Sequence, residues 1–206
     1  MRRILFGSLV ALVAALAAAP AASAQETFTP VFKAPYRTFN DSEFGASLSF
    51  PSGADFGLEG FYTYGKGTND FGLRGGIVSF DNGFDSDTRF VIGGNFRTRV
   101  ISYNESFPLD GALTVGFGGL FGSGAEVFTI PVGVSLGRRL QLEGSSTTFT
   151  PYVHPVLAPV FGEGDSEVEF ALGLGVDINF ARNLSARVSA GVGDIEGVGF
   201  SLAFVR

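Results

Sequence analysis

The last forty residues of the chain alternate between apolar side chains and polar or small ones. Apolar residues occupy every even position from Val168 to Phe180, and the alternation restarts at Leu184 and again at Val198. A period of two predicts strands with one apolar and one polar face. The first run is longer than the usual strand of about 5–6 residues. It also exceeds the about 9–11 residues that a strand needs to cross a bilayer.

Similar segments, separated by turns rich in glycine, asparagine and aspartate, continue through most of the chain. This pattern predicts an all-β fold, a closed antiparallel up-and-down β-barrel. Ten strands are favoured, and eight is the alternative if two early segments do not span. The predicted strands are 43–50, 54–64, 71–80, 88–101, 111–121, 126–137, 147–160, 166–180, 184–192 and 197–205.

The start of the chain predicts export. Residues 1–24 have a basic beginning, an apolar stretch and a small-residue cleavage motif at Ala22-Ser23-Ala24, as a signal peptide does. Residues 25–42 carry Pro30 and Pro35 and alternate little. We expect them to form a lead-in segment on the periplasmic side, packed into or against the mouth of the barrel. Residues 43–206 are the predicted barrel domain.

The apolar residues predict a membrane location for the barrel. Hydrophobic residues make up 45% of the chain, yet no segment after the predicted signal peptide is a run of 18 or more apolar residues. Closed barrels are the other structure that satisfies every backbone group in lipid. We therefore expect a transmembrane barrel in a bacterial outer membrane. An even strand number places both ends of the barrel in the periplasm, together with connections 65–70, 102–110, 137–146 and 181–183.

If the apolar face meets lipid, the other face fills the lumen. The chain has 30 glycines, and many fall on this inner face, where they make room in a narrow barrel. Charges of both signs fall there too, and buried charges need partners. The predicted luminal network contains Arg89, Arg97, Arg99, Glu167, Glu169, Asp177 and Arg187, with Asp55, Glu59 and Arg74 from the less regular early strands. It is interpreted either as a salt-bridge ladder that fills the barrel or as the polar lining of a narrow pore.

Composition limits the chemistry. The chain has no cysteine and one histidine, His154, which argues against a transition-metal site. A net charge of −6 argues against nucleic-acid binding. The alternation places His154 and Tyr152 in the lumen as polar side chains. A membrane lipid hydrolase would need a serine and an acid converging on His154, and no such short motif is present. We expect no catalytic residue, no metal site and no cofactor.

The C-terminal hairpin and last strand carry a resemblance. Residues 168–192, with the tight turn Ala181-Arg182-Asn183, and the final strand 197–204 resemble the small outer-membrane β-barrel family, which includes the OmpA-type transmembrane domain. The resemblance implies outer-membrane lipid and the barrel-insertion machinery as partners. It also implies that Phe200, Leu202 and Phe204 form the insertion signal. The chain departs from the family pattern because Val205-Arg206 follow the last aromatic residue.

Together these features predict an integral outer-membrane β-barrel with a structural or narrow-pore role, no catalysis and no need to oligomerise. The alternative is a soluble exported barrel that buries its phenylalanines and binds an apolar ligand. Leu174→Arg is expected to block membrane insertion because it puts a charge on the lipid face. Gly175→Ser, on the inner face, is expected to be milder.

Overall fold

The computed structural model describes residues 26–35, 41–81, 86–104, 106–122, 126–162, 165–181 and 183–206. The predicted signal peptide, residues 1–24, and Arg182 of the predicted tight turn lie outside these ranges. No helix within them is long and apolar enough to cross a membrane. The strands are β1 Ser42–Pro51, β2 Phe56–Lys66, β3 Asn69–Asp81, β4 Ser86–Ile101, β5 Asp110–Phe121, β6 Val127–Thr129, β7 Val132–Gly137, β8 Leu140–Gln141, β9 Thr148–Gly162, β10 Asp165–Ala181, β11 Leu184–Gly193 and β12 Gly197–Val205.

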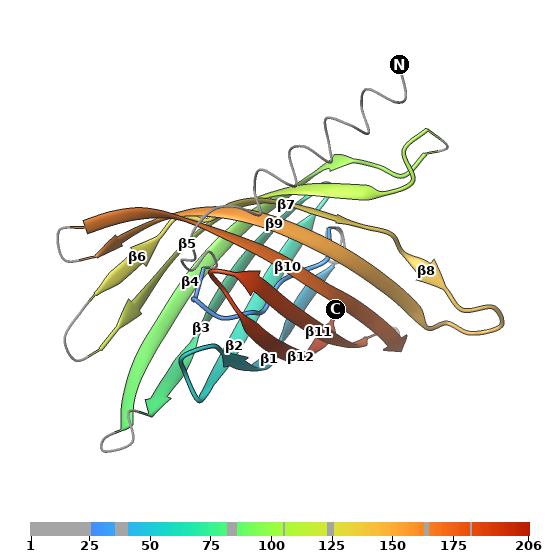
Figure 1. Ribbon diagram of the computed structural model, residues 1–206. Coiled ribbons are helices and arrows are strands. Elements are labelled where there is room, and N and C mark those ends of the chain that lie inside the picture. Colours follow the sequence, from blue (N-terminus) through green and yellow to red (C-terminus); the bar gives the residue numbers. More distant parts are fainter. Residues whose placement is uncertain are drawn as a thin grey trace.

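The strands close into a ring of ten (Figure 1). Strands β1 to β5 pair antiparallel in succession, and so do β9 to β12. Strands β6 and β7 share the place between β5 and β9. The ring closes where β1 pairs with β12, with Phe44 opposite Phe204 and Leu48 opposite Phe200. Long ladders between successive strands hold the ring, such as the one from Asp165–Gly162 to Asn179–Thr148 between β10 and β9. The prediction of an all-β, closed, ten-stranded antiparallel barrel is confirmed, and the eight-stranded alternative is wrong.

The predicted strand 126–137 is interrupted. Its first part, β6, and its second part, β7, both lie between β5 and β9. Pro131 lies at the break and has no N–H to donate to a ladder. Its carbonyl still accepts a 2.8 Å hydrogen bond from Gly116 N–H. The two-residue β8, which was not predicted, pairs only with β9.

The two rims of the barrel differ. The terminal rim holds the start of β1 and the end of β12, where Ser42 and Arg206 exchange two backbone hydrogen bonds of 2.9 and 2.7 Å. The longest connections, residues 102–109 and 138–147, join strands at this rim. The terminal rim also has the two-residue connections 67–68 and 182–183, and at the opposite rim every connection has five residues or fewer. There Asp194 accepts a 2.7 Å hydrogen bond from Phe170 N–H, and partial burial raises the pKa of its carboxyl.

Alternation along each strand separates an apolar outer face from a polar inner face. Leu174 on β10 lies opposite Ala190 of β11 and Val153 of β9, and its side chain is 43% exposed. The inner face is largely buried, including Glu43, Glu59 and Arg97. The outer face carries these large exposed apolar residues, among others: Phe44, Leu48, Leu58, Leu73, Phe90, Ile92, Phe117, Leu157, Val168, Val192 and Phe200.

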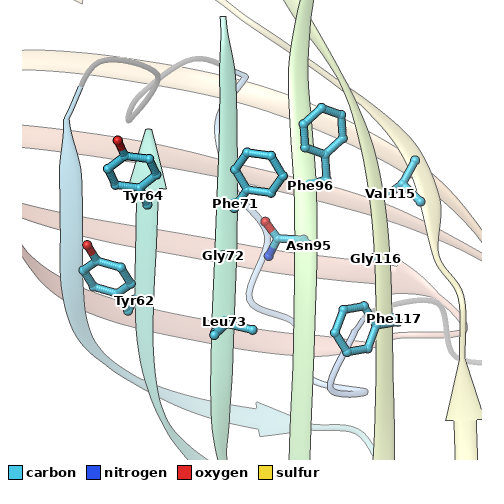
Figure 2. Close-up of a pocket in the computed structure, with 10 residues that line it drawn as sticks. All are labelled: Tyr62, Tyr64, Phe71, Gly72, Leu73, Asn95, Phe96, Val115, Gly116 and Phe117. Atoms are coloured by element: carbon cyan, nitrogen blue, oxygen red, sulfur yellow. The ribbon is translucent and has the colours of Figure 1, made fainter. Parts of the chain in front are cut away.

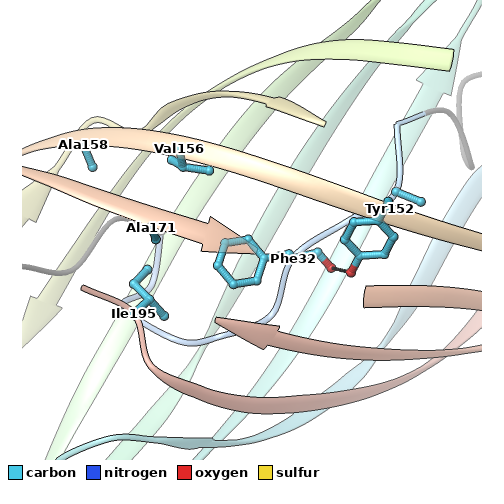
Figure 3. Close-up of a cluster of buried hydrophobic side chains, with 7 residues drawn as sticks. Phe32, Tyr152, Val156, Ala158, Ala171 and Ile195 are labelled. Carbon is cyan, nitrogen blue, oxygen red and sulfur yellow. Dashed lines mark hydrogen bonds between the residues drawn. The ribbon is translucent and has the colours of Figure 1, made fainter. Parts of the chain in front are cut away.

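Residues 26–35, named the luminal segment here, lie inside the ring. Thr27, Thr29, Val31, Phe32 and Ala34 are all 0–1% exposed. Phe32 forms a small apolar cluster with inward residues of β9 and β10 and with Ile195 (Figure 3). The half-buried Phe28 packs against a second cluster of inward residues near the opposite rim. Residues 26–35 of the predicted lead-in segment therefore lie inside the lumen, whereas its residues 25 and 36–40 lie outside the described ranges.

Candidate functional site in the barrel lumen

Arg187 on β11 is the centre of one buried ion cluster. Its Nε and Nη2 donate to the carboxylate of Asp177 on β10, at 2.9 and 3.2 Å, and Nη2 also donates to Glu43 at 3.4 Å. Arg187 lies opposite Asp177 in the strand register, so the two side chains share one level of the lumen. Phe61, an inward aromatic residue of β2, lies with its ring centre 6.0 Å from the guanidinium carbon. The buried guanidinium of Arg187 is thus paired with carboxylates and lies over an aromatic ring. Both are partners that a planar guanidinium group favours.

Arg97 on β4 forms a second cluster near the terminal rim. Its Nε and Nη2 donate to both carboxylate oxygens of Asp70, at 2.9 and 2.6 Å, which is the bidentate geometry that guanidinium and carboxylate favour. Its Nη1 donates to the carbonyl oxygen of Ala34 in the luminal segment. The same side chain therefore neutralises a buried acid and holds the backbone of the segment.

Arg74 on β3 forms the third cluster, again between wall and segment. Its Nε donates to Glu59 at 2.8 Å and its Nη2 to Ser47 Oγ at 3.3 Å. Its Nη1 donates to the carbonyl of Val31 at 3.2 Å and lies 3.8 Å from a carboxylate oxygen of Glu26. Glu59 in turn accepts a 2.6 Å hydrogen bond from Thr29 Oγ1.

Wall side chains hold the backbone of the luminal segment one carbonyl at a time. Ser189 donates to the Pro30 carbonyl at 2.6 Å, Tyr152 to Phe32 at 2.8 Å and Ser135 to Lys33 at 2.8 Å. With Arg74 at Val31 and Arg97 at Ala34, the consecutive carbonyls from 30 to 34 each accept one hydrogen bond from a wall side chain. The donors come from β11, β3, β9, β7 and β4. Buried carbonyls need such partners, and the wall supplies them.

The side chains of the segment fit hollows left by glycine. A Cβ added to Gly173 would overlap the ring of Phe32, and one added to Gly118 would overlap the Glu26 backbone. Both glycines are needed because the segment passes directly against the wall. On the other side, Lys33 Nζ donates to Thr63 Oγ1 at 3.1 Å and lies 6.0 Å from the centre of the Phe61 ring. The segment therefore carries a buried positive charge into the lumen.

The predicted luminal pair Tyr152 and His154 both point inward from β9 and are buried. Tyr152 holds the segment, as described above. His154 Nε2 lies 2.9 Å from Thr114 Oγ1, and its ring meets Phe32 edge-on at 5.9 Å between centroids. These neighbours are a hydroxyl and an aromatic ring.

The predicted charge network is divided among several places. Arg97, Asp177 and Arg187 belong to the buried ion clusters described above. Arg89, Glu167 and Glu169 instead line a cavity of about 260 Å³ at the opposite rim, with Phe28 at its wall. Arg89 bonds there to Asp87 at 2.8 Å and covers the ring of Phe80. Glu169 is buried, whereas Glu167 is exposed.

Two further members of the predicted network lie away from the lumen centre. Arg99 is half-buried near the terminal rim, where its backbone N–H donates to the Thr68 carbonyl at 2.8 Å. The placement of Asp55 in the lumen is wrong. It lies in the exposed turn between β1 and β2, where its N–H bonds to the Ser79 carbonyl at 2.8 Å, because β2 begins only at Phe56.

Sequence reasoning missed Glu43 and Asp70, which pair with Arg187 and Arg97. Each is the second residue of its strand, where alternating neighbours are present on one side only. Extending the period of two by one residue at the start of β3 places Asp70 on the inner face. No such signal identifies the arginine with which each acid pairs. The alternation within one strand does not determine which residues of the other strands lie at the same level of the barrel.

The outer face carries an apolar hollow of about 500 Å³ over β2 to β5 (Figure 2). Tyr62 and Tyr64 line one side of it, and Phe71, Phe96 and Phe117 line the rest. Gly94 makes room for the Phe117 ring, since a Cβ there would lie 2.8 Å from it. The hollow continues the exposed apolar surface and has little polar chemistry.

The C-terminal strand contributes three aromatic or aliphatic side chains to the outer face. Phe200, Leu202 and Phe204, the predicted insertion signal, are all exposed there. Phe204 stacks on Phe44 of β1 with ring centroids 5.7 Å apart, across the closing seam of the barrel. Their alternation with Ser201 and Ala203, which are buried, follows the period of two.

Within the described ranges, no group of three or more histidine, cysteine, aspartate or glutamate side chains is arranged to hold a metal ion. Neither a protein-family model nor a curated protein matches the chain. The function is therefore inferred from the geometry of the barrel. The resemblance in the terminal hairpin and strand stays a prediction. The lumen binds an extended peptide segment, and its buried arginines Arg74, Arg97 and Arg187 are each paired with a carboxylate.

Proposed function

We propose that this chain is an integral outer-membrane β-barrel protein with a structural role and no catalysis, whose lumen is filled by its own luminal segment. The supporting observation is the inverted distribution of side chains. Large apolar residues are exposed all around the ring, while arginine and carboxylate side chains are buried inside it. This arrangement is the one that a hydrocarbon solvent favours for a closed barrel.

The height of the apolar surface agrees with a bilayer. The outward apolar positions of β10 run from Val168 to Phe180. At about 3.4 Å per residue this stretch is roughly 44 Å long, and at a tilt of about 40° it rises roughly 34 Å. The apolar band of outer-membrane barrels is about 25 Å tall, so one strand is long enough to cross it.

The alternative of a soluble barrel that binds an apolar ligand requires an apolar cavity inside. The interior instead contains paired charges and a bound segment, with Phe32 in contact with Gly173 and Tyr152 bonded to its carbonyl. The enzyme alternative requires an acid beside His154, whereas Thr114 and Phe32 are the neighbours with which its ring interacts. Both observations favour a structural barrel.

The direct test is the behaviour of residues 25–206 with and without detergent. We expect folding in detergent micelles or lipid vesicles, a folded form that migrates differently from the boiled form on a gel, and aggregation after detergent removal. A folded, monodisperse species in detergent-free buffer would refute the membrane assignment. Flotation of the native protein with outer-membrane vesicles tests the location separately.

A further inference from the structure

The wall of the barrel recognises the luminal segment mainly through its backbone. The carbonyls of residues 30–34 each accept a hydrogen bond from a different strand. None of these bonds is part of a sheet ladder, and none continues the wall. The segment is therefore a bound peptide that happens to be continuous with the barrel, and its release breaks no strand pairing.

The space that the segment occupies is large enough for water and ions. An extended chain takes up about 4.8 Å by 10 Å in cross-section. The segment runs from Glu26, against Gly118 of β5, to Ala34, which is bonded to Arg97 near the terminal rim. At the opposite rim the path meets the cavity of about 260 Å³ beside Phe28 and Arg89. The segment and this cavity together therefore extend from one rim to the other, past the polar side chains that bind the segment and the apolar side chains of Val78, Val91 and Leu120.

The charges of the wall alone do not balance. Its buried acids outnumber its buried bases among the described residues: Glu43, Glu59, Asp70, Glu169 and Asp177 against Arg74, Arg97 and Arg187. The segment adds the buried Lys33 and also Glu26, whose carboxylate lies 3.8 Å from Arg74, so the excess of acids belongs to the wall itself. A wall with excess carboxylate attracts cations and repels anions, as rings of acidic side chains do in channels.

From these observations we propose that the barrel wall forms a cation-conducting pore and that the luminal segment is the plug that closes it. The inference rests on the proposed membrane location, which the detergent test decides independently. The permeant species are small hydrated monovalent cations such as K⁺. The segment closes the path physically, and it carries one charge of each sign, at Lys33 and Glu26.

The test uses the full mature chain in planar bilayers with KCl. The wild-type protein is expected to be silent. The triple variant Ser135→Ala/Tyr152→Phe/Ser189→Ala removes three of the bonds to the segment carbonyls and leaves every wall charge in place. At about fivefold per hydrogen bond, the open fraction rises roughly a hundredfold. In a KCl gradient the reversal potential shifts toward that of K⁺.

A disulfide lock identifies the path of the current. A Cβ on Gly57 would lie 3.3 Å from Thr29 Cγ2 and 2.6 Å from Ser49 Oγ. Gly57→Cys/Thr29→Cys, with Ser49→Ala to make room, therefore places two thiols side by side in a chain that has no others. In the triple-variant background, oxidation is expected to abolish the conductance and reduction to restore it. Current that is unchanged by oxidation means that ions do not pass the segment, and it overturns the inference.

The other outcomes are equally decisive. A triple variant that shows the folded gel form yet stays silent at all voltages overturns the pore while leaving the membrane assignment intact. Anion preference overturns the charge argument and with it the proposal. If the triple variant does not fold, Ser189→Ala alone takes its place, with a severalfold rise in open fraction expected. Failure of the wild-type chain to insert is a different result, because it refutes the membrane assignment itself.

Discussion

The hydroxyl of Tyr152 donates a 2.8 Å hydrogen bond to the carbonyl of Phe32, a residue 120 positions earlier in the chain. Both residues are buried. The bond joins the wall strand β9 to the luminal segment (Figure 3). The Phe32 ring lies against Gly173 of β10, where an added Cβ would overlap it. A single aromatic side chain thus ties the interior of the barrel to its wall.

Tyr152→Phe is expected to destabilise the folded barrel by about 1–3 kcal/mol, because the carbonyl of Phe32 stays buried without its donor. The measurement is the midpoint of unfolding in urea, followed by the gel shift between folded and unfolded forms. Tyr62→Phe is the matched control, since Tyr62 is exposed on the outer face. Equal effects at both positions would contradict the role assigned to Tyr152.

Arg187→Met is expected to lower the free energy of unfolding by about 3–5 kcal/mol, because it leaves the buried carboxylates of Asp177 and Glu43 without their cation. Adding Asp177→Asn and Glu43→Gln to the same chain should recover most of that loss. Arg89→Met, in a half-buried pair at the rim, should cost less than about 1 kcal/mol. Urea titrations of all three proteins test this ranking, and a loss at Arg89 as large as that at Arg187 would count against it.

Leu174→Arg is expected to make the free energy of insertion into lipid less favourable by about 2–4 kcal/mol, which is the cost of a charge on the lipid face near the midplane. Leu142→Arg is the control, because Leu142 is exposed in the connection beyond β8 rather than on a strand. Gly175→Ser is unsuitable for comparison, since a Cβ there would overlap the hydroxyl of Tyr152. Folding yield in vesicles is the measurement, and equal yields for the two arginine variants argue against a lipid-facing surface.

Gly173→Val is expected to displace the luminal segment, because its side chain would overlap the ring of Phe32. The compensating change Phe32→Ala should return the segment to the lumen. The measurement is the rate of thiol labelling at Thr29→Cys, a buried position in a chain with no cysteine of its own. Fast labelling in Gly173→Val and slow labelling in the double variant are expected. If the double variant labels as fast as the single one, steric displacement is not the cause.

Alternation predicted the faces of the strands and most of their limits. Strand 197–205 matches β12, and 184–192 lies within one residue of β11. This success has a simple origin, because the face of a strand residue depends only on its neighbours two positions away. The break at Pro131 was missed because the apolar alternation continues across it, with Phe128, Ile130 and Val132 all exposed on the outer face.

The contents of the lumen could not be predicted to the same degree. The inward position of Arg187 follows from β11 alone, but its partner Glu43 lies 144 residues away. The luminal segment has no regular secondary structure, so no period marks it as buried. Pro30 and Pro35 indicated an irregular path, and only the closed ring reveals where that path runs.

The luminal segment also sets an order for assembly. The hydrogen bond from Ser189 to the Pro30 carbonyl spans 159 residues. The segment therefore receives this bond only after nearly all of the strands have been synthesised. Contacts between such distant residues form late, because the long loop between them must first be closed. The segment can therefore complete its contacts with the wall only after β11, which carries Ser189, has joined the sheet. The first residues of the described chain thus depend for their final position on nearly the last strand.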